Sequence, residues 1–113
     1  MTGTDYDYDL RQIALMESRI LQFGAGNLSR SRLIDDLDSL LSCLRIIDQN
    51  WKDLFKSEWW TLEQIHAVAL DRKEASLPPD SQKLLAESLG NLRELILRAK
   101  DDLSRSKSMM CPE

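Results

Sequence analysis

The sequence predicts an all-α protein of one domain, folded as an antiparallel up-down four-helix bundle. Four segments carry apolar residues at the spacing of one helix face, about 3.6 residues per turn. No segment alternates with period two over a useful length, so no strand is expected. The chain has 113 residues, enough for one domain, and its 4 Gly and 3 Pro are too few for an architecture rich in β-turns. Helices joined by short loops pack as antiparallel neighbours.

The first helix is expected from about Tyr8 to Gly24. The stretch GAGN at residues 24–27 ends it, because Gly and Asn are common where helices stop. Acids and tyrosines alternate in DYDYD, residues 5–9, where the acids favour a helix N-terminus and a Tyr packs on the core; a mobile contact arm is the alternative. The residues expected to face inward are Leu10, Ile13, Ile20 and Leu21, with Met16 and Phe23 on the flank.

The second helix is expected to begin after Ser29, a suitable N-cap, and to run to about Asp48. Cys43 lies inside this helical pattern and is expected to be a small core residue. A short polar connection at residues 48–50 follows. The residues that share the inward face are Leu33, Leu37, Leu40, Leu41, Leu44 and Ile47.

The third helix is expected to start near Trp51 and to continue to Lys73. The stretch ASLPPDS at residues 75–81 ends it, because Pro78 lacks the N–H that a helix interior needs. The residues that share the inward face are Trp51, Phe55, Leu62, Ile65 and Ala69.

The fourth helix is expected to start at Pro79, because proline suits the first turn of a helix, and to run to about Leu103. Residues 1–103 then form the bundle domain and residues 104–113 a flexible C-terminal tail. The inward-facing residues are Leu85, Leu89, Leu92, Leu95, Ile96 and Ala99.

Two adjacent tryptophans, Trp59 and Trp60, lie in the third helix, where neighbouring residues point about 100° apart. With Leu62 at the centre of the inward face, Trp59 falls about 60° away, at the edge of the core, and Trp60 about 160° away, almost opposite. An outward Trp60 would be a partner anchor, because Trp is enriched at binding hot spots. The alternatives are cover by the N-terminal tyrosines or the tail, a kink near Ser57, or an ordinary lone surface residue.

Acidic residues surround Trp60 on this outward face, and the chain has a net charge of −4. Phosphate binding needs clustered Lys and Arg, so direct binding to nucleic acid is not expected. A basic protein partner fits better, and the acids would speed its capture, although a solvated position is the simpler interpretation of any single Asp. The residues expected to bind the partner are Trp60, Asp53, Glu63, Gln64 and Asp71 in the third helix and Asp35 and Asp38 in the second.

No motif for catalysis, for a cofactor or for a metal is found. His66 is the single histidine and the two cysteines are far apart, so the sequence has no zinc ligand set, and a reducing compartment fits. Glu17 falls on the apolar side of the first helix, where we expect structural pairing with Arg32 or Arg45 rather than catalysis.

The N-terminal residues MTGTDYDYDL do not have the basic start and apolar run of a secretory signal. No stretch approaches the roughly 18 apolar residues of a membrane span. These two features favour a soluble cytoplasmic protein.

Two stretches, ILQFGAGNLSRSRLIDDLDSLLSCL at residues 20–44 and FKSEWWTLEQIHAVALDR at residues 55–72, resemble small helical immunity proteins. These are the immunity proteins of bacterial contact-dependent inhibition and polymorphic-toxin systems, and of the colicin D immunity type. The resemblance implies a cytosolic protein that binds a toxin domain and blocks it, often over the active site. Many such toxins are nucleases with basic surfaces. The resemblance carries over no contact residue; those named above come from the helical wheel.

The expected function is therefore that of a non-enzymatic immunity protein, without cofactor or metal, that neutralises a basic nuclease toxin. One alternative is a homodimeric helical adaptor, in which Trp60 and Leu15 would make a self-contact. The other is a small metal-free enzyme that uses Glu17 or His66.

Overall fold

The computed structural model describes residues 4–72 and 77–110 of the chain. This part of the chain forms four helices and no strand: α1 (Thr4–Gly24), α2 (Arg30–Cys43), α3 (Gln49–Asp71) and α4 (Pro79–Met110). The predicted all-α four-helix bundle is confirmed. Lys73, the expected end of the third helix, lies outside the described residues.

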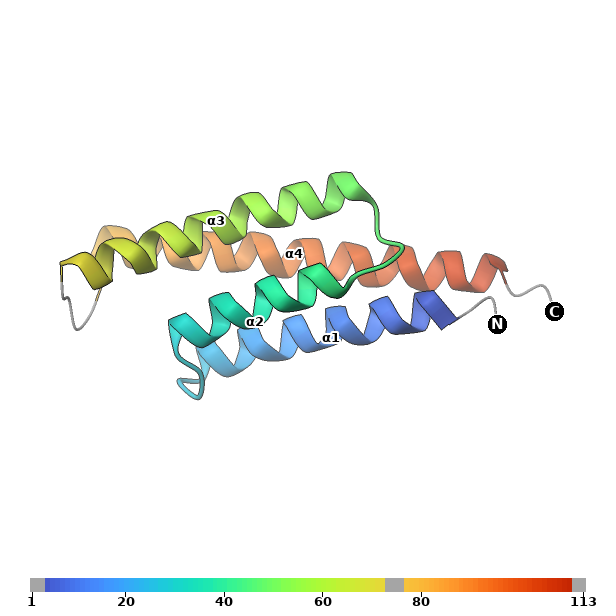
Figure 1. Cartoon of the computed structure of the whole chain (residues 1–113), viewed down its shortest axis with the longest axis horizontal. Coiled ribbons are helices and arrows are strands. Elements are labelled where there is room, and N and C mark those ends of the chain that lie inside the picture. The colour runs from blue at the N-terminus through green and yellow to red at the C-terminus, as the bar shows by residue number, and fades with distance from the viewer. Residues whose placement is uncertain (1–3, 73–76, 111–113) are drawn as a thin grey trace.

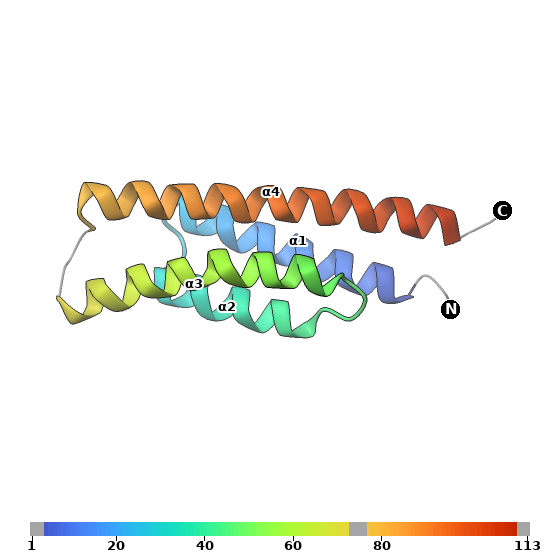
Figure 2. The same ribbon diagram turned by 90° about the horizontal axis from the view of Figure 1, so that it is seen from above.

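The four helices form a closed ring in which each helix packs against two others. α1 lies beside α2 and α4, and α3 also lies beside α2 and α4, whereas the backbones of the diagonal pairs do not approach each other within the described residues. Successive helices run in opposite directions along one axis (Figures 1 and 2), and the bundle measures 57 × 25 × 19 Å. α3 and α4 extend past the loop that joins α1 to α2 (Figure 1). None of the described helices has a stretch long and apolar enough to cross a bilayer.

The ends of the helices follow the local sequence. α1 ends in a Schellman motif: the Gly26 N–H donates to Phe23 O at 3.1 Å and the Asn27 N–H to Gln22 O at 2.9 Å. Gly26 has a φ of +83°, a left-handed conformation that glycine adopts without strain. The Ser29 side chain caps α2 by accepting the Arg32 N–H at 3.2 Å, as predicted.

α2 ends at Cys43, earlier than the predicted end near Asp48. The reason is Asp9, a fully buried residue of α1. Its carboxylate accepts the backbone N–H groups of Arg45, Ile46 and Ile47 at distances between 2.9 and 3.2 Å. These amides are bound across the bundle and do not continue the helical ladder. The Arg45 guanidinium also covers the Tyr8 ring at 4.1 Å, so the connection before α3 is fixed to α1.

α4 begins at Pro79, as predicted, and continues to Met110, past the expected end near Leu103. Residues 104–110 of the predicted tail are thus helical, and residues 111–113 lie outside the described part of the chain.

The main apolar core runs along the ring and contains most of the residues predicted to face inward, while Ile65 and Ala69 pack with Leu77 in a second, smaller cluster. Two expectations were wrong. Leu21 is 53% exposed, because α1 buries the stripe that contains Ile13, Met16 and Ile20 and Leu21 points about 100° away from Ile20. Cys43 is exposed at the last turn of α2, on the side of the helix away from Leu37 and Leu41. The core residues shared by all four helices are Ile13, Met16, Ile20, Leu33, Ile34, Leu37, Leu41, Leu44, Trp51, Phe55, Trp59, Leu62, Leu92, Ile96, Ala99 and Leu103.

Polar contacts join the helices at the edges of this core. Glu17 on α1 accepts a hydrogen bond from the Lys100 ammonium of α4 at 2.9 Å. Structural pairing of Glu17 is therefore confirmed, but the expected partners, Arg32 and Arg45, were wrong. The reason is that Glu17 lies on the side of α1 that faces α4, away from α2.

Candidate protein-binding surface

The two adjacent tryptophans of α3 have opposite environments, as the helical wheel predicts. α3 is a single helix from Gln49 to Asp71, so no break at Ser57 rotates Trp60 inward. Trp59 is 7% exposed and belongs to the core, whereas Trp60 is 54% exposed. Trp60 therefore presents about half of its surface to solvent.

A fixed neighbour supports Trp60. The Trp59 indole Nε1–H donates to the Ile34 carbonyl oxygen of α2 at 2.8 Å, in the buried contact between the two helices. The Lys56 ammonium lies 4.1 Å from the centroid of the Trp59 ring. The Trp60 ring lies beside Trp59, with 6.0 Å between centroids and 32° between planes. One edge of the exposed indole thus rests against a ring held by a hydrogen bond and by packing.

Three contacts between α2 and α3 define the rim beside Trp60. The Lys56 ammonium lies 2.8 Å from the Asp38 carboxylate, and the Arg30 Nε–H donates to His66 Nδ1 at 3.4 Å. The hydrogen bond from Trp59 to Ile34 lies between these two contacts along both helices. Because Asp35 follows Ile34, the structure places it at about the level of Trp60 on the neighbouring helix.

The predicted partner-binding residues fall into two groups. Asp53, Gln64 and Asp71 are exposed and share the outward side of α3 with Trp60. Asp35 is exposed on α2, while Asp38 and Glu63 are half-buried nearer the contact between the helices. The structure therefore places five of the seven residues on α3 and Asp38 on the facing rim of α2, while Asp35 lines a hollow on the α1 side of α2 with Arg19 and Arg32. We call this set, Trp60, Asp53, Glu63, Gln64, Asp71, Asp35 and Asp38, the Trp60 surface.

Two of these carboxylates have partners within the bundle. Asp38 is paired with Lys56, and Asp53 accepts a hydrogen bond from the Gln49 amide at 3.0 Å. Lys52 also faces α2, where its ammonium donates to the Leu44 carbonyl oxygen at 3.4 Å. The sequence identifies Lys56 as a helical neighbour of Trp60, but its pairing depends on which helix lies beside α3. Asp35, Glu63 and Asp71 make no ion pair and no hydrogen bond within the described residues, and of these Asp35 and Asp71 are exposed.

Other features named in the sequence lie elsewhere. Tyr8, a residue of α1, packs under Arg45 of the connection before α3. The backbone of α1 does not lie beside α3, so the N-terminal tyrosines do not cover Trp60. Leu15 is exposed but also lies on α1, so it does not share a rim with Trp60. Glu17 and His66, the two candidates for catalysis, lie on these same non-contacting helices and are not brought together.

A scan of the chain against models of known protein families found no match. Searches of curated proteins and of solved structures also found none at a significant level. The function of the chain is therefore inferred from its own residues and geometry.

Proposed function

We propose that this chain is an immunity protein that binds and neutralises a basic toxin domain through the Trp60 surface. The observation that carries the proposal is the half-exposed Trp60 indole held against the buried Trp59. A large ring that is already supported loses little freedom when a partner covers it, and such residues dominate binding energy. No catalytic step is assigned to the chain; inhibition would follow from occupancy of the toxin.

The charges around Trp60 support a basic partner. Asp35 and Asp71 are exposed without an ion pair in the described residues, and Asp53, Glu63 and Asp38 add carboxylates along the same surface. Unpaired carboxylates attract a cationic surface and raise the rate of encounter, while a central aromatic anchor slows dissociation. A nuclease, which must bind phosphates, has the cationic surface that such acids would occupy.

The immunity role is favoured over general protein binding by the resemblance of residues 20–44 and 55–72 to helical immunity proteins. On this proposal the protein acts in the cytoplasm, where it would meet the toxin domain before the toxin reached its substrate.

The first experiment is affinity capture with three versions of the chain: wild type, Trp60→Arg and Leu97→Arg. Leu97 is a matched control because it is also 54% exposed but lies on α4, outside the Trp60 surface. Each tagged protein is incubated with lysate of the source organism, and retained proteins are identified by mass spectrometry. We expect one basic protein to be retained by wild type and Leu97→Arg and lost from Trp60→Arg, with an affinity loss of about 30-fold or more.

Growth then tests the function itself. The retained protein is expressed alone and together with each variant; we expect it to arrest growth and wild type to restore growth, with no rescue by Trp60→Arg. A retained protein without effect on growth would contradict the immunity role. Recovery of only the chain itself, equally in all three versions, would instead indicate the homodimeric adaptor.

A further inference from the structure

The two adjacent tryptophans of α3 differ in whether a cation of the chain covers the ring. The Lys56 ammonium lies 4.1 Å from the centroid of the Trp59 ring and 2.8 Å from the Asp38 carboxylate. One cation is thus bound between an indole face and a carboxylate, both of which attract positive charge. Among the described residues, no cation covers the Trp60 ring in this way.

A carboxylate without a partner lies one helical turn from Trp60. Glu63 follows Trp60 by three residues, and side chains at this spacing are neighbours on the surface of a helix. Glu63 is half-buried, and its carboxylate makes no ion pair and no hydrogen bond within the described residues. Trp60 and Glu63 therefore repeat the indole and the carboxylate of the Lys56 site without its cation.

The cations at the contact between α2 and α3 have other partners. Lys56, one turn before Trp60, is bound at the Trp59 ring as described above. The Lys52 ammonium donates to a backbone carbonyl oxygen at 3.4 Å, and the Arg30 side chain of α2 donates to the histidine of α3 at 3.4 Å. A cation that covers the Trp60 ring therefore has to come from a partner.

An arginine of the partner fits this position better than a lysine does. A guanidinium is planar, so it can lie flat on an indole and still direct N–H groups to a carboxylate beside the ring. It also binds water less strongly than an ammonium does, so less hydration is lost when an interface covers it. The Trp60 ring lies beside Trp59 at 6.0 Å between centroids and the residue is 54% exposed, so a planar group has a surface to cover.

We propose that Trp60 and Glu63 form an arginine-binding position in the Trp60 surface, where a guanidinium of the partner stacks on the indole and donates to the carboxylate. This inference deepens the proposed function and rests on it for the identity of the partner, a basic toxin domain. It adds that positive charge alone is not sufficient. A lysine-rich segment of the same charge binds more weakly, because an ammonium cannot stack and donate in the same way.

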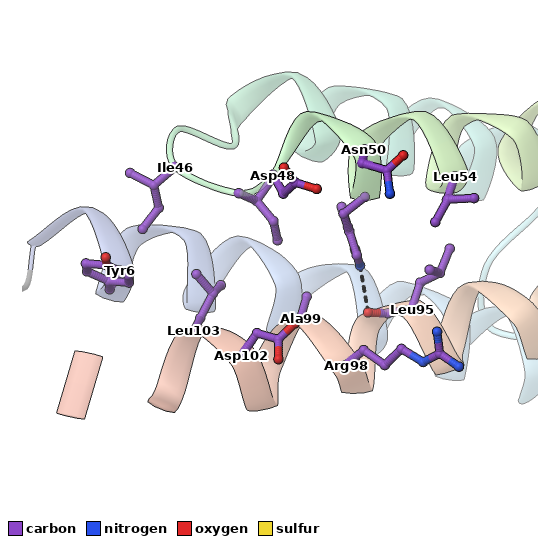
Figure 3. Close-up of a pocket in the computed structure, with 12 residues that line it drawn as sticks. Tyr6, Ile46, Asp48, Asn50, Leu54, Leu95, Arg98, Ala99, Asp102 and Leu103 are labelled. Carbon is purple, nitrogen blue, oxygen red and sulfur yellow. Dashed lines mark hydrogen bonds between the residues drawn. The ribbon is translucent and has the colours of Figure 1, made fainter. Parts of the chain in front are cut away.

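The test uses two blocked peptides of equal charge, hexa-arginine and hexa-lysine. Each is titrated into the ¹⁵N-labelled full chain, and binding is followed through the indole N–H signals. The Trp51 indole N–H donates to the Leu95 carbonyl oxygen of α4 at 2.8 Å (Figure 3), and that of Trp59 is also hydrogen-bonded in the core, so these signals should move less than that of Trp60. We expect the arginine peptide to bind about fivefold more tightly than the lysine peptide.

Four variants separate the ring and the carboxylate from general charge, with binding followed through the Gln64 amide signal. In Trp60→Leu the preference for arginine should fall to about one, because the ring is lost. Trp60→Phe keeps an aromatic ring and should retain more of the preference than Trp60→Leu. Glu63→Gln should weaken binding of the arginine peptide about threefold. Glu87→Gln removes the same charge from an exposed position on α4 and should weaken it less.

Equal affinity of the two peptides, equal movement of the indole signals, an arginine preference that persists in Trp60→Leu, or equal effects of Glu63→Gln and Glu87→Gln would each overturn the proposal. The capture experiment distinguishes its failure from failure of the immunity role. A basic toxin captured through Trp60, without an arginine preference in the peptides, would reject the arginine position alone. An arginine preference without a captured toxin would reject the immunity role alone.

Discussion

The Asp9 carboxylate of α1 accepts the backbone N–H of Arg45 at 2.9 Å, and thereby joins two residues far apart in sequence inside the bundle. The same carboxylate also accepts the N–H groups of Ile46 and Ile47. We expect Asp9→Asn to destabilise the protein by about 2–4 kcal/mol, because the amide replaces one of the two accepting oxygens with an NH₂ donor, so that backbone N–H groups bound to that oxygen lose their acceptor. The measurement is urea unfolding followed by circular dichroism.

The control for Asp9 is Asp5→Asn, which removes an exposed carboxylate 3.5 Å from the Arg45 guanidinium. An exposed ion pair contributes about 0–1 kcal/mol, so this variant should unfold almost like wild type. Equal losses in the two variants would show that Asp9 acts through charge and not through its hydrogen bonds.

Substitution of Gly26 should destabilise the protein, although there is space around this residue for a side chain. A Cβ at Gly26 would meet no atom within 4 Å, so any cost of Gly26→Ala comes from the φ of +83°. We expect a loss of about 1–2 kcal/mol. Gly24→Ala is the matched control, because it is equally open and lies in α1; it should be neutral or stabilising by up to about 1 kcal/mol. In thermal unfolding, the Tm of Gly26→Ala should lie below that of wild type, and the Tm of Gly24→Ala should equal or exceed it.

The two tryptophans should differ in their effect on folding. Trp59→Phe removes a buried indole and its hydrogen bond to Ile34, and we expect a loss of about 2–3 kcal/mol. Trp60→Phe changes an exposed ring and should stay within about 0.5 kcal/mol of wild type. Chemical unfolding of both variants provides the comparison. A larger loss from Trp60→Phe would mean that Trp60 is a core residue, contrary to the Trp60 surface.

Association with a basic partner should depend on salt through the exposed acids. We expect the association rate to fall about tenfold between roughly 50 and 500 mM salt, while the dissociation rate changes little. Asp35→Asn with Asp71→Asn should slow association and flatten this dependence, because both carboxylates are exposed and neither makes an ion pair or a hydrogen bond within the described residues. Stopped-flow measurement with the captured partner gives both rates, and a salt-independent association rate would contradict the steering role.

The spacing of apolar residues was sufficient to predict four helices, most of the core and the opposite directions of Trp59 and Trp60. Those features depend on helical period alone, which the sequence shows directly. Local signals also predicted the C-terminal end of α1 and the starts of α2 and α4, through Gly26, Ser29 and Pro79, whereas α1 begins at Thr4, before the expected start near Tyr8.

Features that depend on which helices are neighbours could not be predicted in this way. The early end of α2 needs Asp9 of α1, and the pairing of Glu17 needs Lys100 of α4. The sequence predicts Asp9 only as one of several acids near a helix start, because no spacing rule links Asp9 to residues 45–47.

The ring of helices also has a consequence for how the protein assembles. Every contact between helices joins neighbours in sequence, except that between α1 and α4. Hairpins of this kind can form locally, at little cost in chain entropy, which favours rapid folding. Closure of α1 onto α4 is the one helix pairing of the described chain that does not join neighbours in sequence, and the Glu17–Lys100 pair lies across that seam. The contact between α2 and α3 is the sparsest of the four, so the bundle should open there first, and amide hydrogens along α2 should exchange sooner than those of α1.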